Sequence, residues 1–139
     1  DNDATSTKIQ YLSRLYLATH IKKYRDSALD GIRYILKAQI PMELASVLAP
    51  SKGYYTHITY NDNAMVNVME LLREVYEKKA PYEYVPDSIC NRARAAFNKG
   101  VECILKTQVV LNGKPTVWCA QHANTPLLPL KHAPMSYPH

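Results

Sequence analysis

The chain has 139 residues, of which 47% are hydrophobic, and its formal net charge is +5. This length indicates one small domain, and the hydrophobic content is enough for a packed core, which excludes an intrinsically disordered chain. The apolar runs are too short to span a bilayer and no signal peptide follows Asp1, so we expect no membrane partner. The positive charge suits a polyanion, but no Lys/Arg block is dense enough to indicate a nucleic-acid-binding arm.

Hydrophobic residues recur at helical spacing in four segments of the chain. The predicted helices span residues 5–19, 25–40, 62–79 and 86–107. Pro41 ends the second of them, because proline cannot continue a helix. The turn dipeptide Asn112-Gly113 lies between two β-prone runs and predicts a short hairpin over residues 109–118.

The second and fourth predicted helices repeat one pattern of residues. The matched residues, in the same order from the two helices, are Gly31, Ile32, Ile35, Leu36, Lys37, Gln39 and Ile40, and Gly100, Val101, Ile104, Leu105, Lys106, Gln108 and Val109. The helices before them also begin alike, with Asp1-Asn2-Asp3-Ala4 in one and Asn61-Asp62-Asn63-Ala64 in the other. A repeated helical pair indicates an α/α architecture in which each pair buries one face against the next.

This repeat places both Asp/Asn clusters at the N-termini of equivalent helices. The clusters should therefore face one end of the array, where carboxylate and amide oxygens suit a hard cation such as Ca²⁺. Simple N-capping is the commoner role of Asp and Asn at such positions. The spacing alone leaves both interpretations open.

The three cysteines predict no zinc site, because none of their spacings matches one. Cys90 and Cys103 lie in one predicted helix about 20 Å apart, which is too far for a disulfide. We expect buried free thiols, and the state of Cys119 is left open.

Four tracts carry a family resemblance. They are DNDAT (residues 1–5), KGYYTHITYNDNAMVN (52–67), ILKTQVV (104–110) and NGKPTVWCAQH (112–122). In this order they resemble motifs of the pectate lyases of polysaccharide lyase family ten, and the resemblance covers most of residues 1–122.

The resemblance implies an all-α fold, a partial (α/α) toroid of antiparallel helical pairs with a short hairpin near 109–118 and an irregular C-terminal tail. It implies calcium-dependent cleavage of polygalacturonate by β-elimination. Calcium neutralises the uronate carboxylate and makes the C5 proton more acidic, and an arginine serves as the base. It also implies a monomer whose parent protein is secreted or periplasmic, since pectin lies outside cells.

The resemblance further assigns candidate site residues. Asp1 and Asp62 match the positions that bring calcium and substrate together, and Asp3 and Asn63 are weaker candidates for the metal. The candidates for substrate binding are Lys114, Trp118, Gln121, His122 and Tyr55. For Trp118, His122 and Tyr55, an ordinary packing role is the alternative.

Two tracts depart from the family pattern, at residues 42–50 and around Ala133. Ala133 stands where the family has its catalytic arginine, and no arginine follows Arg94. Codons can be chosen for both tracts that would encode the family's own motifs if they were read one or two bases later. We therefore hypothesise that insertions or deletions in the gene, or in its sequencing, produced the two divergent tracts. Activity is expected to be impaired.

We therefore expect a partial lyase domain over residues 1–122 and a divergent, irregular tail over residues 123–139. The favoured function is a pectate lyase that binds Ca²⁺ and polygalacturonate. A non-catalytic domain that binds acidic polysaccharides is the alternative. A basic helical module that binds nucleic acid or protein is a third class, and its binding to DNA or RNA would weaken steeply with salt.

Overall fold

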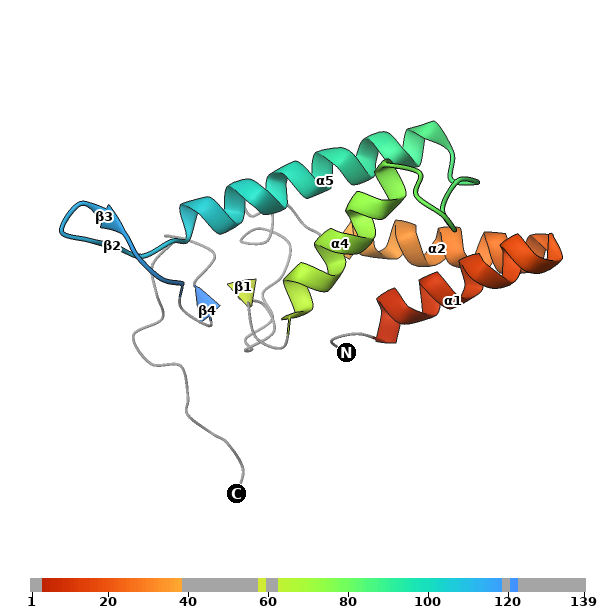
Figure 1. Ribbon diagram of the computed structural model, residues 1–139, viewed down its shortest axis with the longest axis horizontal. Helices are drawn as coiled ribbons and strands as arrows, with labels where there is room; N and C mark the ends of the chain where they lie inside the picture. The colour runs from red at the N-terminus through yellow and green to blue at the C-terminus, as the bar shows by residue number, and fades with distance from the viewer. Residues whose placement is uncertain (1–3, 39–57, 60–62, 119–120, 123–139) are drawn as a thin grey trace, which may run out of the picture.

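The computed structural model describes residues 4–38, 58–59, 63–118 and 121–122 (Figure 1). Four helices lie in these ranges, namely α1 (Ala4–Thr19), α2 (Lys22–Ala38), α4 (Ala64–Tyr76) and α5 (Asp87–Lys106). The hydrophobic spacing predicted all four, and the structure confirms them. In the described part of the chain, none of the helices has the length and apolar character needed to cross a lipid bilayer.

Residues with left-handed backbone set two of the helix ends. His20, with φ of 55°, separates α1 from α2. The link is therefore shorter than predicted, and α2 begins at Lys22 rather than at Arg25. Lys78, with φ of 51°, follows the end of α4, which stops at Tyr76 and not at residue 79 as predicted. Single left-handed residues of this kind are common where helices end.

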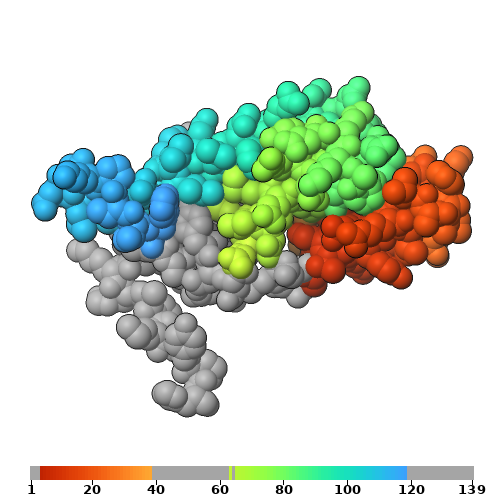
Figure 2. Space-filling view, viewed as in Figure 1, coloured from red at the N-terminus to blue at the C-terminus, as the bar shows by residue number. Residues whose placement is uncertain are grey.

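The helices pack as two pairs, α1 with α2 and α4 with α5. Smaller contacts of α2 with α5 and of α1 with α4 join the pairs. In the space-filling view, the α1–α2 pair and the β2–β3 hairpin (Val110–Leu111 and Lys114–Pro115) lie at opposite ends of the molecule (Figure 2). The predicted helical pairs are confirmed, and a complete toroid stays a prediction.

One hydrophobic core joins the two pairs. Its buried members are Ile9, Leu29, Ile32, Ile35, Leu71, Leu72, Val75, Tyr82, Val85, Ile89, Cys90 and Ala93. Full burial of an aliphatic side chain stabilises the fold by about 1.5–3 kcal/mol, so this core is the main force that holds the pairs together. Cys90 is a buried free thiol, as expected, and its Sγ donates to the Val75 carbonyl at 3.3 Å.

A buried polar contact ties α1 to the connection between α4 and α5. The Ser13 hydroxyl is fully buried and donates to the Ile9 carbonyl at 2.8 Å. Its oxygen also lies 2.7 Å from the Tyr84 hydroxyl. Because the single proton of Ser13 is used on Ile9, Tyr84 is the donor in the second bond.

The two copies of the sequence repeat make equivalent close contacts between their helices. A Cβ on Gly31 of α2 would lie 2.6 Å from Cγ1 of Ile9 in α1. A Cβ on Gly100 of α5 would lie 3.1 Å from Sδ of Met69 in α4. Ile9 and Met69 hold the same position relative to the two Asp/Asn clusters. The matched glycines therefore serve one purpose, which is to let the two helices of each pair approach closely.

Two short antiparallel strand pairs complete the described structure. Strands β2 and β3 form the predicted hairpin, with φ of 51° at Asn112 and 76° at Gly113 in its turn. Strand β1 (Ile58–Thr59) pairs with β4 (Gln121–His122), a pairing that the hydrophobic pattern does not predict. Two-residue strands carry too little periodicity to be recognised in a sequence.

Candidate functional site

The N-terminal half of α1 faces α4 across a polar cavity of about 150 Å³. Its lining consists of Ser6, Thr7 and Gln10 of α1, Asn67, Glu70, Leu71 and Glu74 of α4, and Tyr82 of the following connection. Among the first four residues of α4 only Asn67 lines this cavity, so the convergence of the two helix starts stays a prediction. Asp1, Asp3 and Asp62, the predicted metal ligands, lie outside the described residues.

Asn63 is the predicted metal ligand that the structure does describe. It directly precedes α4, has a left-handed backbone with φ of 56°, and makes no capping hydrogen bond with its side chain. Asparagine tolerates this conformation better than most residues. Asn63 thus holds the N-cap position of α4, but its exposed side chain is not used to cap the helix. Within the described ranges, no group of three or more His, Cys, Asp or Glu side chains is placed to hold a metal ion.

The β1–β4 pairing brings two of the motif tracts together. Ile58 pairs with His122 and Thr59 with Gln121. Strand β1 lies shortly before Asn63 in the chain, and Figure 1 shows β1 and β4 next to the start of α4. The backbone at Gln121 and His122 is thus held beside the segment that leads into α4. Tyr55 lies outside the described residues, as does Ala133.

Trp118 is anchored by its indole nitrogen. Nε1 donates to the Ile104 carbonyl in the last turn of α5 at 2.7 Å. Such carbonyls lack a backbone partner within their own helix, and the Ile104 carbonyl accepts both from Trp118 and from the Thr107 hydroxyl, at 3.1 Å from the latter. The side chain nevertheless remains 44% exposed. The two interpretations of Trp118 are therefore compatible, because the indole nitrogen is held by a hydrogen bond while part of the ring stays exposed.

Lys114 lies on β3, opposite Leu111 of β2, and is exposed. The hairpin projects beyond the C-terminal end of α5 (Figure 1). Backbone bonds between Val109 and Val117 and between Thr116 and Val109, at 2.8 Å each, hold its base. The hairpin thus connects Lys114 rigidly to Trp118, whereas β4 lies further along the chain beside β1.

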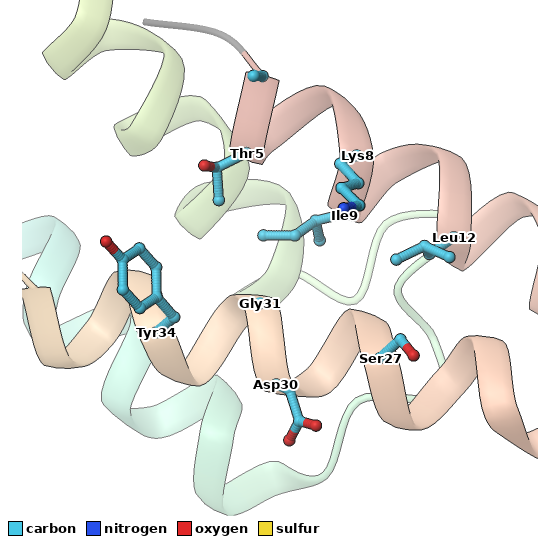
Figure 3. A pocket seen from close by; sticks show the side chains of 9 residues that line it. Thr5, Lys8, Ile9, Leu12, Ser27, Asp30, Gly31 and Tyr34 are labelled. Atoms are coloured by element: carbon cyan, nitrogen blue, oxygen red, sulfur yellow. The ribbon is translucent and has the colours of Figure 1, made fainter. Parts of the chain in front are cut away.

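A larger cavity, of about 610 Å³, lies on the other side of α1, between α1 and α2 (Figure 3). Thr5, Lys8 and Ile9 line it from α1, and Asp30 and Tyr34 line it from α2. None of the predicted site residues lines this cavity. It is therefore separate from the elements that carry the family motifs.

Residues 1–137 match the family model described as pectic acid lyase. The chain belongs to this family. A family 10 polysaccharide lyase from Cellvibrio cellulosa has a similar structure, with a TM-score of 0.79 and 34% identity over 91% of this chain and 40% of that one. A mutant of a family 10 polysaccharide lyase from the same organism, in complex with trigalacturonic acid, gives a TM-score of 0.76 and 32% identity over 88% and 39% of the two chains. A search of curated protein sequences finds no match.

The chain thus spans about two fifths of the length of the family 10 lyases that it resembles. Membership of the pectic acid lyase family confirms the resemblance that the four motif tracts indicated. The matched range includes the two tracts that depart from the family pattern, at 42–50 and around Ala133.

Proposed function

We propose that this chain is the part of a pectate lyase that binds polygalacturonate, and that the whole enzyme cleaves the polymer by β-elimination with Ca²⁺. The observation that carries this proposal is the gathering of motif segments at one place. Strand β4, from the NGKPTVWCAQH tract, is held beside β1, from the tract that leads into α4. The relative solved with trigalacturonic acid supports the class of ligand, and the net charge of +5 suits a polyuronate.

We assign calcium to Asp1 and Asp62, with Asn63 and Asp3 as further oxygen donors. Carboxylate and amide oxygens are the ligands that Ca²⁺ prefers. Asn63 fits this role because its side chain is exposed and is not used to cap α4. Bound calcium would neutralise the uronate carboxylate and acidify the C5 proton. The residues of this chain would hold and orient the sugar for that chemistry.

Trp118 and Lys114 supply a polymer-binding surface on the hairpin. The partly exposed indole offers a flat apolar face for a sugar ring, and its bond to the Ile104 carbonyl fixes its orientation. The exposed ammonium of Lys114 would pair with a uronate carboxylate. We assign Gln121, His122 and Tyr55 to the same polymer by their place in the motifs.

We further propose that the activity of this chain is impaired. No arginine occurs after Arg94, and Ala133 stands at the place of the family's base. This observation favours the second candidate function, a domain that binds acidic polysaccharide without cleaving it. We place the parent protein outside the cell or in the periplasm, where pectin is accessible.

The decisive experiment measures ultraviolet absorbance of the unsaturated product on polygalacturonate, with and without calcium, together with binding of the polymer by affinity electrophoresis. Binding without cleavage supports a disabled lyase. Calcium-dependent cleavage supports the family activity and refutes the assignment of the missing base to Ala133. A folded chain that neither binds nor cleaves contradicts the proposal.

Two substitutions test the polymer-binding surface. Trp118→Ala is expected to weaken binding by about tenfold, because an apolar contact of more than 1 kcal/mol is lost. Lys114→Ala is expected to weaken binding by a few fold, and more at low salt, because the ion pair is exposed. Lys99→Ala, which removes an exposed charge from α5, is the matched control and should leave binding nearly unchanged.

A further inference from the structure

The hairpin that carries Lys114 is apolar apart from that single charge. Residues 109–118 contain no other charged side chain. Three aliphatic side chains of the same stretch, those of Val110, Leu111 and Val117, are exposed. Apolar side chains that gather on a surface mark contact sites more often than isolated ones do. The hairpin therefore combines one cation with an exposed apolar surface.

The strand register places Leu111 directly opposite Lys114. The side chains of opposed residues lie on one face of an antiparallel pair, with their Cβ atoms about 5 Å apart. Val110 and Pro115 form the next pair, and their side chains lie on the other face because successive side chains of a strand alternate. Leu111 is thus the aliphatic neighbour of Lys114, and Val110 is not.

Lys114 is open to a carboxylate, because it is exposed and forms no ion pair with a residue in the described ranges. A polyuronate that places a carboxylate on Lys114 brings the neighbouring part of its chain against Leu111. A second free carboxylate there would lose water beside an apolar side chain without gaining a partner. A methyl ester at that place carries no charge, and its methyl group can pack on Leu111.

We propose that the hairpin selects polygalacturonate that is partly methyl-esterified, and that Leu111 determines this specificity. Lys114 binds a free carboxylate, and Leu111 contacts a nearby methyl ester. The inference rests on the proposed function, because it concerns the polymer assigned to the same hairpin. A fully esterified polymer loses the ion pair with Lys114, and a polymer without esters loses the contact with Leu111. Binding should therefore be tightest at intermediate esterification.

The test compares binding of the full chain to polygalacturonate and to pectins of equal length and graded methyl esterification, by isothermal titration calorimetry. The salt concentration is about 0.15 M, at which attraction to the more highly charged polymer is screened beyond about 8 Å. Half-esterified polymer should bind about fourfold more tightly than unesterified polymer, which is the gain from burying one methyl group. Equal binding of the two polymers, or tighter binding of the unesterified one, overturns the proposal.

Two neighbouring residues supply a variant and its matched control. Leu111→Ser removes the apolar side chain beside Lys114, whereas Val110→Ser removes one of nearly equal exposure, 59% against 58%, on the other face. Leu111→Ser should reduce the fourfold preference to about one, and Val110→Ser should leave it intact. Leu111→Met keeps an apolar side chain of similar volume and should keep the preference. An unchanged preference in Leu111→Ser, or an equal loss in Val110→Ser, overturns the proposal.

Two further measurements separate the proposal from other causes. Trp118 is the only tryptophan of the chain, so its fluorescence reports whether the end of the hairpin is intact in each variant. Sedimentation velocity tests whether the apolar surface joins two copies of the chain. A dimer that Leu111→Ser abolishes would assign Leu111 to that interface and overturn the proposal.

The outcomes also separate this inference from the proposed function. Binding of polygalacturonate without a preference for esters refutes only the specificity assigned to Leu111. Absence of binding to every polymer, in a folded chain, contradicts the proposed function as well.

Discussion

The two equivalent glycines are expected to respond to alanine with opposite signs. Replacing glycine by alanine inside a helix gains about 1 kcal/mol from backbone propensity. At Gly31 the new Cβ would lie 2.6 Å from Cγ1 of Ile9, which is only 2% exposed. Ile9 is β-branched, so its Cγ1 cannot swing away without a change of rotamer or a shift of α1. Overpacking of this kind costs about 1–3 kcal/mol, so Gly31→Ala should be destabilising by about 1 kcal/mol.

At Gly100 the nearest atom is Sδ of Met69, at 3.1 Å. Methionine is unbranched and adapts to small changes in the space around it, so the helix propensity should dominate. Gly100→Ala is expected to stabilise the protein by about 0.5–1 kcal/mol. A change of 1 kcal/mol shifts the melting temperature of a domain of this size by about 4 °C. Thermal and guanidinium unfolding followed by far-ultraviolet circular dichroism would resolve a difference of this size.

A third variant isolates the cause. Ile9→Met gives the first pair the residue that the second pair carries at the equivalent position. In that background Gly31→Ala should lose most of its penalty, with a coupling of about 1 kcal/mol in the double-mutant cycle. Two results would refute the reasoning. One is stabilisation by Gly31→Ala alone, and the other is an equal penalty with Ile9 and with methionine.

Three further predictions concern individual contacts. Tyr84→Phe should destabilise the fold by about 1 kcal/mol through loss of the hydrogen bond to Ser13, which guanidinium unfolding measures. The hydrogen bond and charge of Lys78 hold the pKa of Asp87 below its ordinary value. The stabilisation of the fold by this carboxylate is therefore complete above about pH 3.9, and it is lost as the pH falls through the pKa that Asp87 has in the folded state. An NMR titration should show the pKa of Asp87 rising toward its ordinary value in Lys78→Ala. Trp118→Phe keeps a ring but loses the indole donor, so amide hydrogen exchange at the C-terminal end of α5 should quicken while polygalacturonate binding falls less than in Trp118→Ala.

The helices and their pairing could be predicted because their signals are local or repeated. Four amphipathic segments give four helices, and the matched glycines mark the contact within each pair. Asn112 and Gly113 predict the hairpin because few residues tolerate the turn that it requires. The β1–β4 pairing could not be predicted, because two residues on each strand carry no usable pattern and their partners are remote in the sequence.

The site could be predicted only in part. The motifs indicate Trp118 as a candidate, but its bond to the Ile104 carbonyl depends on where the hairpin meets α5. Glu70, Glu74 and Tyr82 could not be predicted to share a cavity, because on the sequence they look like surface charges and a core aromatic. Only the contact of α1 with α4 turns them into the wall of one cavity.

The β1–β4 pairing has a consequence for the order in which the molecule folds. Closing a long loop costs conformational entropy, and this cost grows slowly with loop length. A pair of two-residue strands forms few hydrogen bonds, so it does little to offset that cost. An isolated pair of this size is unstable in water, so it needs the helices between its strands to shorten the loop first. The segment before α4 and the end of the Trp118 motif should therefore join late, after α4 has packed on α5. Chains that are still completing this last step would have a formed core before they have a complete polymer-binding surface.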